Sequence, residues 1–186
     1  LDIPGAELDN ILTLRTIEDS RAIEANLNKG SQILVVGGGF IGLEVAASAR
    51  MRGAEVIVLE ANSRLMGRSL PAEASDVFLK LHAENQISVR FNQNVKEFLG
   101  KNEVHEVATI SGETIKADAV IIGIGISPET NLAESAKLKI DNGIVVDEYA
   151  RTSNPYIFAA GDNTNHFNPM LKRHIRLEAW LNAQDQ

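Results

Sequence analysis

The chain has 186 residues, of which 44% are apolar, and a formal net charge of −7 from 18 basic and 25 acidic side chains. This charge gives no support to nucleic acid or an anionic membrane as a partner, and the absence of a membrane-length apolar run and of a signal-peptide pattern predicts a cytoplasmic protein. The absence of cysteine excludes a disulfide, a thiolate metal site and a Cys-x-x-Cys redox pair within these residues, and the four histidines are too far apart in sequence to predict a metal site.

The first elements expected along the chain are a linker and a capped helix. Residues 1–13 have no strong hydrophobic period and are expected to form an entering segment. Thr16, with Asp19 three residues later, predicts the start of a helix, and Gly30 is expected to end it.

A strand, a glycine turn and a helix follow. Residues 33–36 are apolar and too few for a helix, and they run directly into Gly37, Gly39 and Gly42, which satisfy G-x-G-x-x-G. The first glycine permits a tight turn, the second lets a pyrophosphate approach the backbone, and the third lets the next helix, expected at residues 40–52, pack closely on the sheet. The residues expected to contact the nucleotide here are Gly37, Gly38, Gly39, Phe40, Ile41 and Gly42.

The end of the next strand carries an acidic residue. Residues 55–59 predict a second buried strand, and Glu60 closes it where the acid of this fingerprint accepts hydrogen bonds from the adenosine ribose hydroxyls. A 2′-phosphate beside this carboxylate would be repelled, so NAD(H) is the expected nucleotide. Arg64, four positions later, remains a residue that can reach a phosphate.

Residues 71–84 predict a helix, with apolar contacts from Val77, Leu79 and Leu81. The later elements are expected as a strand at 87–91, an antiparallel meander at 95–99, 104–111 and 113–116, a buried strand at 117–126, a short helix at 131–138, and strands at 144–146 and 156–159. The buried strand ends in Gly123, Ile124 and Gly125, which predict a second place where backbone passes close to a ligand or another element.

Four passages resemble a known family of proteins. They are Leu-Arg-Thr-Ile-Glu-Asp at 14–19, the glycine fingerprint at 37–60 with its Gly-Leu-Glu, Thr-Ser-Asn-Pro-Tyr-Ile-Phe-Ala-Ala-Gly-Asp at 152–162, and Arg-Leu-Glu-Ala-Trp at 176–180 followed by 182–186. In these passages the chain resembles the flavin-dependent pyridine nucleotide oxidoreductases, and within them the ferredoxin, putidaredoxin and rubredoxin reductases.

The resemblance implies an α/β fold in two parts. Residues 1–120 are expected to form a Rossmann-like NAD(H)-binding domain, with a parallel sheet, helices and an antiparallel meander. Residues 121–186 are expected to form the C-terminal, incomplete part of an FAD-binding domain, so that the chain is an internal fragment of a larger flavoprotein.

The resemblance also implies roles for single residues. Asp162 is expected to bind the ribityl and pyrophosphate region of FAD, with Gly161 allowing the close approach. Trp180 resembles the residue near the flavin ring. Glu44 resembles the carboxylate near the nicotinamide and flavin N5, and it is the expected catalytic residue.

The implied function is an NADH-dependent reductase that passes hydride from NADH to FAD and then electrons to an iron-sulfur protein or a rubredoxin. Two alternatives stay open. One is a relative with another acceptor, such as an NADH oxidase, the large subunit of nitrite reductase or a disulfide reductase. The other is an NADH-sensing protein like apoptosis-inducing factor.

Overall fold

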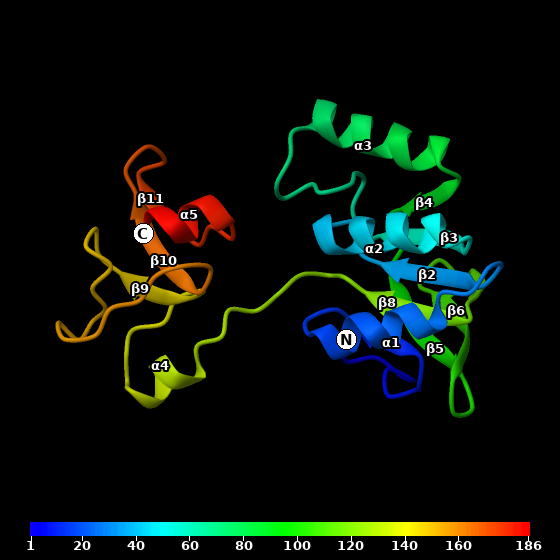
Figure 1. Ribbon diagram of the computed structural model, residues 1–186, viewed down its shortest axis with the longest axis horizontal. Helices are drawn as coiled ribbons and strands as arrows, with labels where there is room; N and C mark the ends of the chain where they lie inside the picture. Colours follow the sequence, from blue (N-terminus) through cyan, green and yellow to red (C-terminus); the bar gives the residue numbers. More distant parts are fainter. The chain divides into compact units, whose positions relative to one another are not determined.

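The computed structural model describes residues 1–186, which form two compact units, Leu1–Gly125 and Ile126–Gln186 (Figure 1). The expected α/β fold class, with a parallel sheet, helices and an antiparallel meander, is confirmed. None of the helices has both the length and the apolar character needed to cross a bilayer.

The first unit is built on a five-stranded parallel sheet in the order β1-β8-β2-β3-β4. Its strands are β1 (Ile11–Thr13), β2 (Gln32–Val36), β3 (Glu55–Glu60), β4 (Ile87–Phe91) and β8 (Ala119–Ile122). The prediction of a linker over residues 1–13 is therefore wrong for the last three residues. They form β1, which joins the sheet beside β8, with Ile11 opposite Val120.

The two faces of this sheet are covered differently, and both are buried. Helices α1 (Ile17–Asn26), α2 (Phe40–Met51) and α3 (Ala72–Glu84) share a core with one face. The antiparallel strands β5 (Val95–Gly100), β6 (Val104–Thr109) and β7 (Thr114–Lys116) share a core with the other. In β2, Ile33 and Val35 face the helices while Leu34 and Val36 face the antiparallel sheet. Burial on both sides explains why β2 is an unbroken apolar run.

Helix α1 begins with the capping box that the sequence predicted. The Thr16 hydroxyl accepts from the Asp19 backbone N–H at 3.2 Å, and the Asp19 carboxylate accepts from the Thr16 N–H at 2.8 Å and the Arg15 N–H at 2.9 Å. The helix ends at Asn26, so the expected end at Gly30 is wrong: the chain leaves the helix in the residues before the glycine.

This cap makes stability depend on pH at acidic values. The hydrogen bonds from the backbone N–H of Thr16 and then of Arg15 hold the pKa of Asp19 below its usual 3.8. Because the folded-state pKa is the lower one, the stabilisation is present above about pH 4 and is lost as the pH falls through the folded value. We expect Asp19→Asn to lower the free energy of unfolding at pH 6 and to match the unchanged protein near pH 2, in denaturant titrations at several pH values. Glu18→Gln, in the same turn, is the control and should follow the unchanged protein; a loss in Asp19→Asn that is the same at every pH would contradict the account.

Helix α3 packs with a different face from the one expected. Val77 and Leu81 are exposed, contrary to the prediction, and the face toward the core carries Ser75, Leu79 and His82. Positions 75, 79 and 82 follow the helical period of 3.6, whereas alternate positions such as 77, 79 and 81 cannot share one helical face.

The second unit is a small mixed sheet with two short helices. Strand β9 (Ile144–Val146) pairs in parallel with β10 (Thr164–Asn168), which pairs antiparallel with β11 (Arg173–Ile175). The helices are α4 (Asn131–Ser135) and α5 (Trp180–Asp185). The strand expected at 156–159 is wrong: this segment has only an isolated bridge between Arg151 and Phe158, because a turn at Asn154, closed by the Ile157 N–H, interrupts it.

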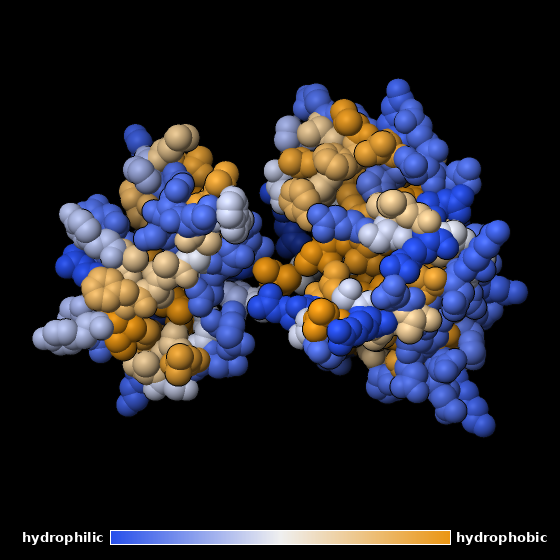
Figure 2. Space-filling model, viewed as in Figure 1, coloured by the Kyte–Doolittle hydropathy of each residue, from blue (hydrophilic) through white to orange (hydrophobic).

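The second unit buries few apolar side chains. Its core consists of Ala133, Ile144 and Val146, with partly buried neighbours. Large apolar residues lie on its surface (Figure 2). Among the aromatic residues, Trp180 is 73% exposed. Trp180 is therefore a surface residue of this unit and no part of its core.

Candidate functional site

The glycine turn lies at the carboxyl edge of the parallel sheet, where the strand order reverses. Strands β3 and β4 lie on one side of β2, and β8 and β1 on the other. In open α/β sheets this switch point is where ligands bind. The segment after β8 meets the turn here, and the Gly123 N–H donates to the Val36 carbonyl at 2.8 Å.

Three glycines at this edge are required by internal packing. A Cβ on Gly42 would overlap the carbonyl oxygen of Gly37. A Cβ on Gly37, which has a φ of +109°, would lie 2.7 Å from the Gly123 carbonyl carbon, and one on Gly123 would lie 3.1 Å from the Gly42 Cα. Gly37, Gly42 and Gly123 thus bring β2, α2 and β8 into backbone contact.

Gly39 is different, because nothing in the protein requires a glycine there. The nearest atom to an added Cβ is the Gly123 carbonyl oxygen, 3.9 Å away, and φ of −85° with ψ of −177° is a conformation open to any residue. Gly39 is the N-cap of α2, and no side chain caps this helix. The first N–H groups of a helix have no partner within the helix, so here they are left for an external acceptor.

Glu60 holds the glycine turn from the end of β3. Its side chain is buried, and Oε2 accepts from the Gly38 N–H at 2.7 Å. Oε1 accepts from the backbone N–H and the side-chain amide of Asn62 at 2.8 and 2.6 Å. Three of about four acceptor positions of the carboxylate are therefore used within the protein. This internal role is added to the ribose contact that the sequence predicted.

The arginine expected to reach a phosphate is bonded within its own loop. The Arg64 guanidinium donates to the carbonyls of Leu70 and Gly67, each at 2.7 Å. Arg68 was not predicted, because no motif marks it; it is exposed and donates to the Ile124 carbonyl at 3.1 Å. Both arginines line a cavity of about 480 Å³ in the loop after Glu60, together with Asn62, Ser63 and Gly67.

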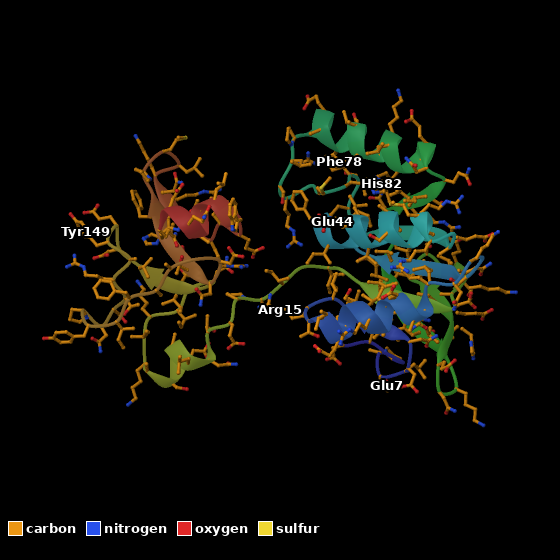
Figure 3. All side chains as sticks on the ribbon, in the orientation of Figure 1. Glu7, Arg15, Glu44, Phe78, His82 and Tyr149 are labelled. Atoms are coloured by element: carbon orange, nitrogen blue, oxygen red, sulfur yellow. The ribbon has the colours of Figure 1, made fainter.

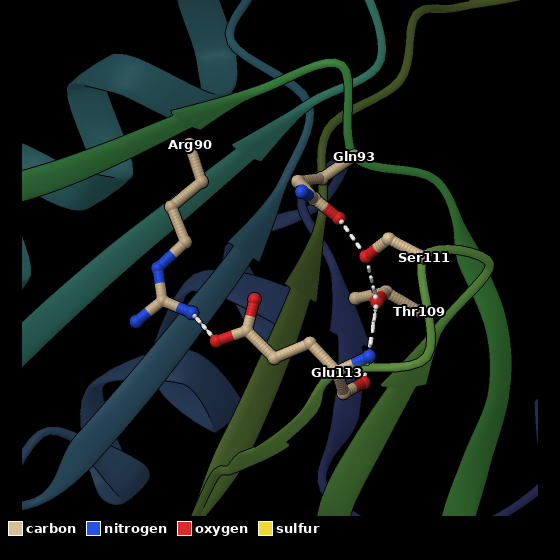
Figure 4. A network of polar contacts seen from close by, with 5 residues as sticks. All are labelled: Arg90, Gln93, Thr109, Ser111 and Glu113. Carbon is tan, nitrogen blue, oxygen red and sulfur yellow. Dashed lines mark hydrogen bonds and ion pairs between the residues drawn. The ribbon is translucent and has the colours of Figure 1, made fainter.

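A larger hollow of about 640 Å³ lies at the opposite edge, beside the first residues of β2 and β3. Arg90 and Glu113 pair at the wall of this hollow. From Glu113, whose backbone N–H donates to the Thr109 hydroxyl at 3.2 Å, a hydrogen-bond chain runs through Thr109 and Ser111 to Gln93, and these three residues do not line the hollow (Figure 4). Because the hollow lies away from the switch point of the sheet, we do not include it in the candidate site.

The remaining predicted residues of the first unit lie near the start of α2 and the end of β8. Glu44 is exposed on α2, and its carboxylate makes no hydrogen bond or ion pair (Figure 3). Phe40 is 53% exposed and Ile124 47% exposed, and Gly125 has a φ of +131°. The structure thus brings the glycine turn, Glu60 and the segment after β8 to one edge.

The other predicted residues lie in the second unit. Gly161 has a φ of +93°, and its N–H donates at 2.8 Å to the side chain of Gln186, directly after α5. The helix that begins at Trp180 therefore packs on the Gly161 turn, where Ala183 lies against the glycine. Asp162 is exposed, and its carboxylate is unpaired.

Comparisons with a family model and with curated proteins point to the same type of protein. The family model described as pyridine nucleotide-disulphide oxidoreductase matches residues 1–186. The ferredoxin–NAD(+) reductase component of the anthranilate 1,2-dioxygenase system of Burkholderia cepacia is 42% identical over 93% of this chain and 43% of its own. Rhodocoxin reductase of Rhodococcus erythropolis is 41% identical over 100% of this chain and 44% of its own.

Among solved structures, the covalent putidaredoxin reductase–putidaredoxin complex aligns with a TM-score of 0.94 and 34% identity, over 100% of this chain and 46% of that one. The chain therefore spans less than half the length of the relatives that it matches.

Proposed function

Since the chain belongs to the pyridine nucleotide-disulphide oxidoreductase family, we propose that it is part of an NADH-dependent flavoprotein reductase. The NAD(H)-binding domain, expected at residues 1–120, extends in this proposal to the end of the first unit at Gly125, because β8 belongs to its parallel sheet; the second unit is the C-terminal part of an FAD-binding domain. The bound cofactors supply the chemistry, in which hydride passes from NADH to FAD and electrons then pass to an iron-sulfur protein or a rubredoxin.

The observation that carries the proposal is Gly39. A glycine that neither backbone conformation nor internal packing requires, at the uncapped start of α2, indicates that an external group occupies the space of its side chain. A dinucleotide pyrophosphate fits, because it is anionic and approaches the backbone closely at this position.

Different residues at this edge bind different parts of the dinucleotide. The free N–H groups at the start of α2 bind the pyrophosphate, and Phe40, Ile41 and Gly38 line its approach. Glu60 uses its remaining acceptor position for the adenosine ribose. Glu44, whose carboxylate is exposed and unpaired, orients the nicotinamide. Hydride transfer needs no protein nucleophile, so the role of these groups is orientation and electrostatics.

The segment after β8 and the loop after Glu60 border the same site. Gly123, Ile124 and Gly125 form its wall on the far side of the glycine turn, and Arg64 stiffens the adenosine end through its two carbonyl contacts. Arg64 therefore acts on the shape of the pocket through two of its five guanidinium N–H groups.

Three residues of the second unit suit FAD. The unpaired carboxylate of Asp162 accepts hydrogen bonds from ribityl hydroxyls, and Gly161, with its left-handed φ, lets the chain turn close to the pyrophosphate. Trp180 presents an exposed aromatic face to the flavin ring.

The acceptor we propose is a ferredoxin- or rubredoxin-type protein, in keeping with the relatives named ferredoxin–NAD(+) reductase component and rubredoxin–NAD(+) reductase. We also propose a cytoplasmic location. Steady-state reduction of an added iron-sulfur protein by the full-length flavoprotein separates this function from an NADH oxidase or an NADH sensor. Consumption of NADH that is unchanged by the acceptor would favour the oxidase, and no turnover with any acceptor would favour the sensor.

The nucleotide preference tests the site directly. A 2′-phosphate about 4 Å from the Glu60 carboxylate costs about 1 kcal/mol in water and about 4 kcal/mol near a protein surface. Calorimetric titration should therefore show NADPH binding about fivefold to a thousandfold more weakly than NADH. Glu60→Gln keeps an oxygen for the Gly38 N–H but removes the charge, so it should weaken NADH and strengthen NADPH.

The control for this prediction is Glu55→Gln, which makes the same charge change at the other end of β3 and should leave both dissociation constants unchanged. Equal affinity of the unchanged chain for the two nucleotides would contradict the assignment of Glu60.

A further inference from the structure

Helix α3 buries polar side chains and exposes apolar ones. Ser75 is 2% exposed and His82 7% exposed, while Val77 and Leu81 are 66% and 51% exposed. Positions 75 and 82 are seven residues apart and share one face of the helix. Buried polar groups are costly unless they are hydrogen-bonded, so the partners of Ser75 and His82 show what this face does.

Ser75 anchors the segment that packs on the glycine turn. Its hydroxyl donates to the Leu65 carbonyl at 2.6 Å. The Leu65 side chain is fully buried, and a Cβ added to Gly38 would lie 2.6 Å from its Cδ2. The next residue, Met66, donates its N–H to the Gly38 carbonyl at 2.9 Å. One hydroxyl on α3 therefore fixes the segment that sets the position of Gly38.

His82 connects α3 to the first turns of α2. Its Nδ1 lies 2.8 Å from the Phe78 carbonyl of its own helix, so we assign a proton to Nδ1 from this geometry. In this tautomer Nε2 is not a donor, so its position 3.5 Å from the carbonyl oxygen of Leu43, the residue before Glu44, is a packing contact of the ring. Figure 3 shows His82 between the two helices. Its ring thus touches the backbone that carries Glu44.

We propose that Ser75 and His82 are positioning residues of the dinucleotide site. Ser75 sets the glycine turn through Leu65, on the side that takes the pyrophosphate and ribose. His82 sets the turn of α2 that carries Glu44, on the side that takes the nicotinamide. Neither side chain touches the nucleotide. The inference rests on the proposed function, since it assigns positions within that site.

Two nucleotides separate the two roles. NADH occupies both sides of the site, whereas ADP-ribose lacks the nicotinamide. His82→Asn keeps a donor near the position of Nδ1 but is too short to touch Leu43, whereas His82→Gln is long enough to keep contact with it. Calorimetry on the 186-residue chain should show His82→Asn raising the NADH dissociation constant about fivefold, because the turn that carries Glu44 loses its packing partner, with ADP-ribose unchanged. His82→Gln should restore NADH binding, and the control His105→Asn, at an exposed position, should change neither.

Ser75→Ala is the second variant in this experiment and tests the role of Ser75. It should raise the dissociation constants of NADH and ADP-ribose together, about fivefold, because it acts on the side that both ligands share. Thermal unfolding of every variant separates positioning from stability alone. Lower midpoints for His82→Asn and Ser75→Ala, with dissociation constants unchanged in the folded proteins, would overturn the inference and leave the proposed function standing. If the unchanged, folded chain binds neither NADH nor ADP-ribose, the proposed function and this inference both fall.

Discussion

Gly39→Ala should raise the dissociation constant for NADH by one to two orders of magnitude, about 1.4–2.8 kcal/mol, and lower the unfolding midpoint only slightly, because glycine is the better residue at a helix N-cap. The added methyl group lies 3.9 Å from the nearest atom of the protein, and the backbone there is extended, so the fold accommodates alanine. The same methyl group occupies the space through which the pyrophosphate reaches the N–H groups of α2.

Calorimetry and thermal unfolding on the same preparation check this prediction. Ser48→Ala, on the exposed surface of α2, is the control and should alter neither quantity. Unchanged NADH affinity in Gly39→Ala would remove the main support for a pyrophosphate at this turn. A midpoint lowered as far as that of Gly42→Ala would show that the fold requires Gly39 beyond its place at the N-cap.

Gly42→Ala should have the opposite signature, a large loss of stability. Its methyl group would overlap the Gly37 carbonyl oxygen and crowd the Val35 side chain. Neither group is free to move away, because Val35 is fully buried and the Gly37 N–H is bonded to the Leu59 carbonyl. Overpacking of this kind costs typically about 1–3 kcal/mol, which for a chain of this length lowers the midpoint by roughly 2–4 °C per kcal/mol.

Thermal and denaturant unfolding measure this loss. NADH binding should weaken as well, because α2 must shift away from the sheet. An unfolding midpoint equal to that of the unchanged chain would contradict the close packing of α2 on β2. The two substitutions are chemically identical and three residues apart, so together they separate a glycine required by the ligand from one required by the fold.

Local features of the sequence predicted the centre of the first unit. The strand at 33–36, the glycine turn and Glu60 were all placed correctly, because an apolar run, glycines and an acid at fixed spacing are encoded within one short segment. The edge strand β1 was missed because its three residues have no pattern of their own and pair with β8 more than a hundred positions later.

The bonds that hold the site were beyond sequence reasoning for a similar reason. Glu60 bonds the Gly38 N–H from 22 positions away, and His82 contacts the Leu43 carbonyl from 39 positions away. These acceptors and donors are backbone groups, which carry no sequence signal. The only sequence pattern that pointed to the buried face of α3 was the seven-residue spacing of Ser75 and His82. The apolar residues Val77 and Leu81 led the prediction to a different face of the helix.

Amide chemical-shift mapping of the 186-residue chain with NADH tests most directly whether NAD(H) binds at the carboxyl edge of the parallel sheet. The largest shifts should fall on residues 38–42 and 123–125, with smaller ones near Glu60. Shifts confined to the opposite edge around Gln32 and Glu55, or no shifts in a folded chain at saturating NADH, would contradict NAD(H) binding at the carboxyl edge.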